Sequence, residues 1–401
     1  MLLKFANRVT SRIFFTISIF SLLVPKNRKL ILFGAFGGKH YGDNSGSLYL
    51  YCLKYHKDEF RCVWLTDNVD VISYIRGIGG EAYLKKSLTG MWLSLRAGIV
   101  VICYRIEDVL FYKPISKKTI ILHLCHGIAV REGHLESKKS ATKGDLEFDY
   151  YKKYALYMAA TSLWAADRQR MIMSVPPSRT AITGYPRNDV WFNPDKAMIN
   201  SLSSKYDLGK YTILYAPSWR KWRPIHYFPF DDFDINGLYC FLKERNITVI
   251  IRPHRTDFKR QNKGMFWKLM NDLDEVVIVV TQDDLVDVQP LLYLSDCLIT
   301  DYSSIQYDFL LLNRPIIYLT YDIGDYIQKV GLNKDFNNLA VGPKPVTQAE
   351  FISSLEMFYN NEDPFYEERI QARDIVHKYK DGQSCKRVYE LIKEITALFN
   401  R

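Results

Sequence analysis

The sequence lacks the cysteine and acidic patterns of disulfide-rich and metal-binding proteins. Its seven cysteines are scattered along the chain and form no C-x-x-C pair, so neither a disulfide framework nor a zinc site is predicted. The protein is therefore expected in a reducing compartment. No cluster of carboxylates has the spacing of metal ligands, and we expect no tightly bound metal or other cofactor.

Long apolar runs are also absent. The run over residues 13–24 is uncharged and mostly apolar, but a membrane-spanning helix needs about 20 such residues. Basic residues flank this run on both sides, and no small-residue cleavage site follows it. We therefore expect residues 1–24 to form a short helix that lies on an anionic membrane surface. An ordinary core helix remains the alternative.

Acidic residues are fewer than basic ones. Lys and Arg number 54 against 44 Asp and Glu, which gives a formal net charge of +10. Such an excess favours anionic partners such as phosphates or anionic lipids. Nucleic acid is not an expected partner, because no known binding module is present and the aromatic residues are not interleaved with Lys and Arg.

Short apolar runs alternate with helix-like segments along most of the chain, which predicts parallel strands buried on both faces. The runs form two series on either side of the polar stretch 193–210. They predict an α/β protein with two Rossmann-like, doubly wound domains that face a cleft. We expect these domains over residues 25–195 and 205–380, followed by a C-terminal helix in 381–401. The expected strands are 30–33, 62–65, 99–102, 120–124, 212–215, 248–251, 276–279, 297–300 and 315–318.

Polar motifs follow several of these strands, where open α/β sheets bind ligands. His126 comes at the end of one strand, before Gly127, and is placed to titrate near neutrality in a cleft. A structural histidine in a turn is an equally good interpretation of His126, and a better one of His123, which lies inside the strand. The turn at 184–189 presents Arg187 and Asn188. The glycine-rich loop 34–38 is not G-x-G-x-x-G, so it predicts a tight turn more than a phosphate cradle.

The second series carries three such motifs. Ser218 and Arg220 follow one strand, in a basic loop that suits either a phosphate or plain solvent. Arg252 and Arg255 bracket His254, and this disfavours the charged histidine unless an anion is nearby. The third motif is Asp301-Tyr302-Ser303-Ser304, which leads from a buried strand into an apolar helix. Ser303 is expected to cap this helix, and both serines with the free N–H groups predict an anion site.

Together these motifs resemble the CDP-glycerol glycerophosphotransferase family, which contains the teichoic acid primases and polymerases. The resemblance covers residues 25–379, and its most specific part is the segment 294–304, continued by Asp308 and Arg314-Pro315. It implies a GT-B fold in which the C-terminal domain holds most of the CDP. It also implies that His126 is the catalytic base and that His254 acts on the pyrophosphate. The implied substrate contacts come from Arg187, Asn188, Ser218, Arg220, Arg252, Asp301, Ser303, Ser304 and Asp308.

The chain departs from the family pattern at both histidines. The family's Trp-His-Gly-Thr-Pro-Leu-Lys is here Cys125-His126-Gly127-Ile128-Ala129-Val130-Arg131, which keeps the histidine and a distal cation and loses the threonine hydroxyl. The family's His-Pro becomes Pro253-His254-Arg255. We expect these changes to affect which acceptor and which polyol the enzyme uses more than the transfer reaction itself.

The resemblance implies transfer of a polyol phosphate, most readily glycerol phosphate, from a CDP-polyol to a lipid-linked acceptor, with release of CMP. The enzyme is expected as a peripheral protein on the cytoplasmic face of a bacterial membrane. An ordinary GT-B glycosyltransferase and a non-catalytic membrane scaffold remain the alternatives. The sequence does not identify the polyol or the oligomeric state. It also does not distinguish a priming enzyme from a polymerase, or teichoic acid synthesis from capsule synthesis.

Overall fold

The structure is a computed structural model that describes residues 23–110, 118–128, 155–260 and 263–398. Within them the chain forms two compact units. One takes in the described residues up to 126 together with 155–189 and 381–398, and the other takes in residues 127–128 and the described part of 190–380. The predicted C-terminal segment thus belongs to the amino-terminal unit. Almost all of the predicted membrane segment 1–24 lies outside the described residues. No helix of the described part is long and apolar enough to cross a bilayer.

The first unit is built on a parallel sheet of seven strands in the order β3-β2-β1-β4-β5-β6-β7. Its strands are β1 (Asn27–Phe33), β2 (Arg61–Thr66), β3 (Glu81–Leu84), β4 (Ala97–Ile102), β5 (Ile120–His123), β6 (Ala155–Ala160) and β7 (Thr180–Ile182). The chain order therefore reverses between β1 and β4. In open α/β sheets such a reversal leaves a crevice at the carboxyl ends of the two strands, where ligands bind.

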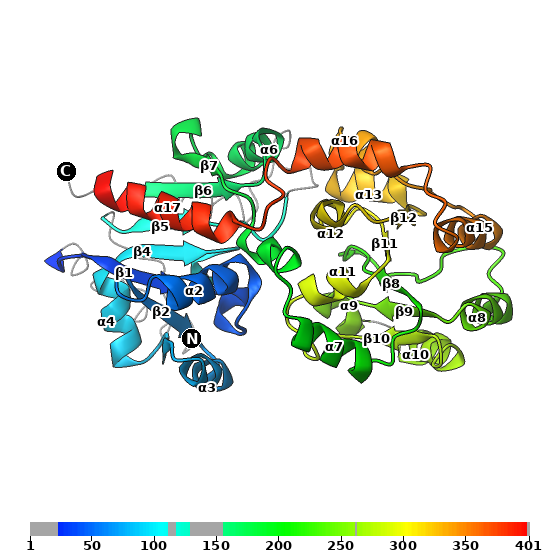
Figure 1. Ribbon diagram of the computed structural model, residues 1–401, viewed down its shortest axis with the longest axis horizontal. Helices are drawn as coiled ribbons and strands as arrows, with labels where there is room; N and C mark the ends of the chain where they lie inside the picture. Colours follow the sequence, from blue (N-terminus) through cyan, green and yellow to red (C-terminus); the bar gives the residue numbers. More distant parts are fainter. Residues whose placement is uncertain (1–22, 111–117, 129–154, 261–262, 399–401) are drawn as a thin grey trace, which may run out of the picture. The chain divides into compact units, whose positions relative to one another are not determined.

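Helices cover both faces of this sheet. They are α2 (Asp43–Tyr55), α3 (Val69–Gly77), α4 (Leu88–Arg96), α6 (Leu163–Met173) and α17 (Ser384–Leu398), with short 3-10 turns η1 (Phe36–Gly38), η2 (Ile106–Asp108), η3 (Pro177–Arg179) and η4 (Pro186–Trp191). Helices α2 and α17 lie side by side over one face (Figure 1). Buried residues of α17, among them Val388 and Ile392, pack with Ile31, Phe33 and Leu122 of the strands in one core.

The second unit contains a parallel sheet of five strands in the order β10-β9-β8-β11-β12, with the same kind of reversal between β8 and β11. Its strands are β8 (Tyr211–Tyr215), β9 (Ile247–Ile251), β10 (Val277–Val279), β11 (Cys297–Thr300) and β12 (Ile316–Tyr318). Its helices are α7 (Lys196–Lys205), α8 (Ile235–Glu244), α9 (Arg255–Arg260), α10 (Lys263–Asp272), α11 (Gln289–Leu294), α12 (Ile305–Phe309), η5 (Leu310–Leu312), α13 (Ile323–Val330), α14 (Phe336–Leu339), α15 (Gln348–Tyr359) and α16 (Tyr366–Val376).

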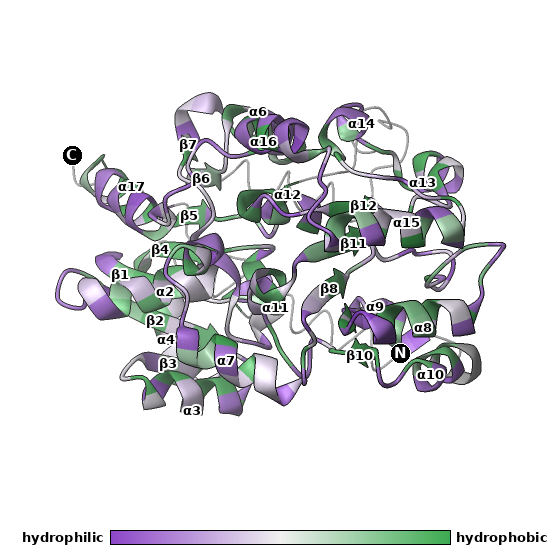
Figure 2. Cartoon of the chain, turned by 45° about the vertical axis from the view of Figure 1, so that its right-hand side comes forward, coloured by the Kyte–Doolittle hydropathy of each residue, from purple (hydrophilic) through white to green (hydrophobic). Residues whose placement is uncertain are grey.

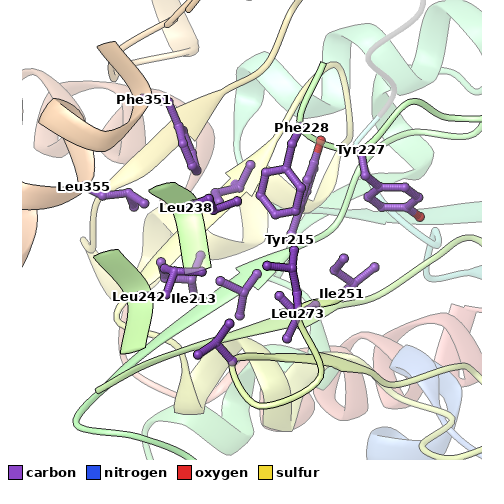
Figure 3. Packing of buried hydrophobic residues seen from close by; sticks show 14 of the residues in the cluster. Ile213, Tyr215, Tyr227, Phe228, Leu238, Leu242, Ile251, Leu273, Phe351 and Leu355 are labelled. Carbon is purple, nitrogen blue, oxygen red and sulfur yellow. The ribbon is translucent and has the colours of Figure 1, made fainter. Parts of the chain in front are cut away.

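Apolar packing between sheet and helices holds this unit together. Figure 3 shows Ile213 and Tyr215 of β8 and Ile251 of β9 beside Leu238 of α8 and Phe351 of α15. The strands are short apolar runs, and Figure 2 shows them in the hydrophobic colour, whereas most helices carry both colours. A strand buried on both faces needs a continuous apolar run, and a surface helix needs only an apolar stripe.

The α/β class with two parallel sheets, which is the coarser part of the predicted fold, is confirmed. Every predicted strand is present to within a few residues. Strands β3, β6 and β7 were not predicted, because β3 and β7 are short and lie at the edges of the sheet and β6 is rich in alanine. Helix α7 lies inside the stretch 193–210 that its polar composition had marked only as a boundary.

Candidate active site

His126 follows β5 and presents its side chain from the carboxyl end of the sheet. Cys125, the residue before it, has a left-handed φ of 61°, which turns the chain sharply as it leaves the strand. The His126 side chain is 57% exposed, although Cys125 before it and Asp43 beside it are buried. A titratable ring that leaves the core at this edge is available to a ligand.

A buried carboxylate orients the His126 ring. Asp43 is the first residue of α2, is only 2% exposed, and accepts a hydrogen bond from Nδ1 of His126 through Oδ2. Because a carboxylate can only accept, the hydrogen of the neutral ring is assigned to Nδ1, which leaves the Nε2 lone pair free to take a proton. The charge of Asp43 raises the pKa of His126 above its usual range.

Two further side chains hold this pair. Arg187 donates from NH1 to Asp43 Oδ1 at 2.8 Å and to the His126 carbonyl at 2.6 Å. Asn44 accepts from the Arg187 backbone N–H at 3.0 Å and donates to the Cys125 carbonyl at 2.7 Å. Burial alone would raise the pKa of Asp43, but the charges of His126 and Arg187 outweigh it and lower that pKa to about 2. Asp43 is therefore ionised at neutral pH.

Aromatic rings and strained backbone surround the same histidine. Phe36 and Tyr104 stand edge-on to the His126 ring, with centroids 6.0 Å and 6.4 Å away. Phe36 and Asp43 have left-handed φ values of 51° and 57°, as Cys125 does. A non-glycine residue in this region costs on the order of 1 kcal/mol, and such residues concentrate at functional sites.

A second buried acid, Asp108, fixes the loops beside His126. Its Oδ1 accepts the Gly37 N–H at 2.8 Å, and its Oδ2 accepts the backbone N–H groups of Cys103, Tyr104 and Arg105. Burial raises the pKa of Asp108. The loop approaches so closely that a Cβ on Gly34 would lie 2.0 Å from the Asp108 carbonyl oxygen. Gly34 thus allows a close approach of the two loops, and the tight turn predicted for this loop is η1, where the Gly38 N–H donates to the Ala35 carbonyl at 2.8 Å.

His123 is structural, in line with the interpretation favoured for it. The ring is buried, Nδ1 accepts the Cys125 N–H at 3.0 Å, and Nε2 lies 3.3 Å from the Tyr104 carbonyl. Burial lowers the pKa of His123 to about 4, so the ring is neutral. Arg131, the distal cation of the motif, lies outside the described residues.

In the second unit, the serine motif forms a turn after β11. The prediction that Ser303 caps the helix was wrong in register, because Ser304 occupies the cap position of α12 and makes no capping bond with its side chain. Ser303 Oγ instead accepts the Ile305 N–H at 3.4 Å, and the buried Gln306 amide donates to the Ser303 carbonyl at 3.1 Å. Both serines remain half-buried at the carboxyl end of the sheet.

Asp301 links this turn to the loop after β8. Its Oδ1 accepts from Ser218 Oγ at 2.7 Å and from Ser218 N at 2.8 Å. Its Oδ2 pairs with Arg220. Strands β8 and β11 are neighbours at the point of reversal, so Asp301 ties together the two loops that border it.

Arg220 is completely buried, which differs from the substrate contact predicted for it. Nε and NH2 bind Asp322 at 3.0 Å and 2.7 Å, and NH1 binds the Ser218 carbonyl at 2.6 Å as well as Asp301. Burial opposes the charge, yet Asp301 and Asp322 raise the pKa of Arg220 above its usual range. With all three nitrogens engaged, Arg220 positions the loop.

Arg252 is likewise engaged with backbone rather than placed as a free cation. Its two terminal nitrogens donate to the carbonyl oxygens of Val280, Thr281, Leu285 and Val286. Burial lowers the pKa of Arg252 to about 10, so it is still charged at neutral pH. It organises the loop after β10 and adds positive potential there.

His254 is exposed and stands at the start of α9. Its Nδ1 accepts the Thr256 N–H at 3.2 Å, which assigns the hydrogen of the neutral ring to Nε2. The ring stacks on Trp219, with centroids 5.9 Å apart. The pyrophosphate contact expected of His254 stays a prediction.

Asn188 and Asp308 are the remaining predicted substrate residues, and both are buried. Asn188 is 2% exposed in η4, and Asp308 is 3% exposed in α12. The direct contacts predicted for them are not compatible with this burial unless the surrounding side chains move.

The sequence motifs missed the acids that organise both clusters, namely Asp43, Asp108 and Asp322. Only Asp43 could have been found from the sequence, because it directly follows Gly42 at the start of a helix. Among the side chains that the structure describes, no three His, Cys, Asp or Glu are grouped as metal ligands would be. The absence of a tightly bound metal or cofactor stays a prediction.

A family model described as CDP-Glycerol:Poly(glycerophosphate) glycerophosphotransferase matches residues 16–394. The chain belongs to this family. The predicted membership and the predicted transferase class are thereby confirmed.

Relatives in this family are similar along nearly the whole chain. The teichoic acid glycerol-phosphate transferase of Staphylococcus aureus (strain NCTC 8325 / PS 47) is 28% identical over 95% of this chain and 96% of its own length. The teichoic acid poly(glycerol phosphate) polymerase of Bacillus subtilis (strain 168) is 25% identical over 97% of this chain. The chain spans about half of that polymerase, 52% of its length.

The fold of the family is also found in a solved structure. The wall teichoic acid polymerase TagF superposes with a TM-score of 0.77 and 22% identity, covering 99% of this chain and 97% of that chain. At this identity the likeness shows the fold alone.

Proposed function

We propose that this family member transfers a polyol phosphate, first of all glycerol phosphate, from a CDP-polyol to a hydroxyl of a lipid-linked acceptor or growing polymer in teichoic acid or capsule-type polymer synthesis. The acceptor oxygen attacks the β-phosphorus, the bond from that phosphorus to the bridging oxygen breaks, and CMP leaves with that oxygen. The proton of the hydroxyl passes to Nε2 of His126.

The observation that carries this proposal is the Asp43–His126 pair. A half-exposed imidazole whose Nδ1 is held by a buried, ionised carboxylate is poised to accept a proton at Nε2. Arg187 and Asn44 hold the pair in place. The aromatic edges of Phe36 and Tyr104 border the ring and offer a surface for the acceptor.

For the donor, the proposal uses the loops at the carboxyl ends of the second sheet. Ser303 and Ser304 supply hydroxyls, and His254 supplies a donor nitrogen for the pyrophosphate. Arg220 and Arg252 act by holding loops and by their charge. Phosphoryl transfer depends mainly on such positioning and charge stabilisation. No tightly bound cofactor is part of the proposal.

We also propose a peripheral location on the cytoplasmic face of the bacterial membrane, through residues 1–24. The apolar run 13–24 and its basic flanks support this. A GT-B fold with two Rossmann-like domains belongs to the same proposal and is supported by the two parallel sheets, each with a reversal of strand order.

The test is to incubate the protein with a panel of CDP-polyols and a synthetic lipid acceptor and to weigh the products. We expect CMP and an acceptor heavier by one polyol phosphate, and a loss of about 10²–10⁴ in turnover in His126→Ala with little change in donor affinity. Release of a nucleoside diphosphate would indicate a glycosyltransferase instead. Near-full activity of His126→Ala would remove the base from the mechanism.

A further inference from the structure

The outer face of α4 carries large apolar side chains that stay exposed among the residues the structure describes. Leu88 is 84% exposed and Trp92 is 52% exposed, and their spacing of four residues places them on one side of the helix. Arg96, another four residues along, lies over the Trp92 ring at 5.7 Å. A stripe of leucine, tryptophan and arginine combines apolar bulk with a cation at one end.

Basic side chains gather at the end of α4 that carries Arg96. Lys26 donates to the Leu95 carbonyl, and Arg28 donates to the Lys118 carbonyl at 3.0 Å. Burial, together with the charges of Arg28 and Lys118, lowers the pKa of Lys26 to about 8. Cations this close repel one another, and a nearby anion relieves the repulsion.

The chain enters the unit beside this cluster. The described residues begin at Leu23, which is exposed, three positions before Lys26. The preceding residues in the sequence are the apolar run 13–24 and the basic residues Lys4, Arg8 and Arg12. A segment predicted to lie on a membrane therefore joins the folded unit where the fold itself presents tryptophan, leucine and cations.

We propose that Leu88, Trp92, Arg96, Lys26, Arg28 and Lys118 form an α4 surface that contacts an anionic lipid bilayer. The inference rests on the membrane location proposed above and extends it from the N-terminal segment to the folded unit. Tryptophan and leucine insert at the boundary of head groups and acyl chains, and the cations meet the anionic head groups. Two contacts on one unit would fix its orientation on the membrane, which a single contact would not do.

The test measures partition of the full chain onto vesicles of 30% phosphatidylglycerol in phosphatidylcholine and onto pure phosphatidylcholine. One variant is Leu88→Ala with Trp92→Ala, and a second is Arg96→Glu with Lys118→Glu. The matched control is Trp267→Ala with Lys268→Glu, since Trp267 of the second unit is 41% exposed. We expect the charge variant to bind the anionic vesicles at least about 25-fold less, from roughly fivefold per cation removed. The apolar variant should lose about tenfold or more, and the control should match the parent.

The outcomes separate the surface from the rest of the proposed function. If both variants bind as the parent does, the α4 surface is not a membrane contact. If the variants bind as the parent does but change from dimer to monomer in solution, the surface joins copies of this chain, and that also overturns the proposal. A parent that binds neither vesicle would refute the membrane location itself. Transferase activity on a water-soluble acceptor should be unchanged in every variant, so a failed transferase proposal would appear in this assay alone.

Discussion

Replacing Asp43 by asparagine removes one charge from the proposed base and leaves the shape of the side chain almost intact. The carboxylate is buried, and its pKa lies at about 2 against an ordinary 3.8. A difference of this size corresponds to roughly 2.5 kcal/mol of stability. Because the pKa is lower in the folded protein, this stabilisation is complete above about pH 4 and is lost as the pH falls toward 2. At neutral pH, Asp43→Asn should therefore lower the free energy of unfolding by about that amount.

The same substitution should change the pH dependence of turnover. His126 accepts a proton only when it is neutral, so activity should rise with pH through the pKa of His126, which Asp43 raises. Without the charge, that pKa falls and the acidic limb moves to lower pH. Turnover should also fall, on the order of 10²-fold, because the ring is no longer held with its hydrogen on Nδ1.

The assay is the pH profile of kcat from pH 5 to 9 for the parent and Asp43→Asn, together with melting temperatures. Asp363→Asn is the matched control, since it removes a carboxylate that pairs with Arg369 in the other unit. The control should melt lower and keep the acidic limb in place. An Asp43→Asn protein that melts lower but keeps both the limb and the turnover of the parent would show that Asp43 only stabilises the fold.

Three further perturbations test the remaining proposals. Ser303→Ala with Ser304→Ala should weaken CDP binding by about tenfold or more in calorimetry, with a small change in melting temperature because the bond to Ser303 is long; normal CDP affinity would place the donor site elsewhere. Arg220→Ala should cost about 3–5 kcal/mol in denaturant unfolding, because Asp301 loses its cation and Asp322 keeps only Arg223; an unchanged unfolding midpoint would contradict the buried network. Deleting residues 1–24 should leave an active enzyme that partitions poorly to anionic vesicles, and undiminished pelleting would show that this segment is not the anchor.

The sequence predicted the sheets well because their signal is local. The run Cys297–Thr300 is apolar up to its last residue and is buried at every position, so its pattern identifies a strand wherever the chain places it. Strand β3, Glu81–Leu84, has one buried residue among four. The hydrophobic pattern of so short a segment cannot be told from that of a loop.

The roles of single residues at the site depend on distant partners, and there the sequence was less informative. Asp43 and His126 are 83 residues apart in the sequence, and Arg220 and Asp322 are 102 residues apart. The basic loop that contains Arg220, Lys221 and Arg223 could bind a phosphate, face solvent or form a buried ion pair. Its sequence fits all three equally well until the partners of these residues are known. The motifs therefore located the carboxyl ends of the right strands. They did not distinguish side chains that are exposed to a ligand from side chains that hold the loops in place.

The position of α17 has a consequence for the order in which the chain folds during synthesis. Most of the second unit is the continuous stretch 190–380, whereas the first needs residues 381–398 to complete its core, where Val388 and Ile392 are fully buried. At about 5–20 residues per second, some 200 residues separate residue 189 from the end of α17, a delay of roughly 10–40 s. During that time the amino-terminal unit exposes the apolar face that α17 later covers. A ribosome that stops just before α17 therefore releases a chain whose carboxyl-terminal unit is whole and whose amino-terminal unit is exposed to chaperones and proteases.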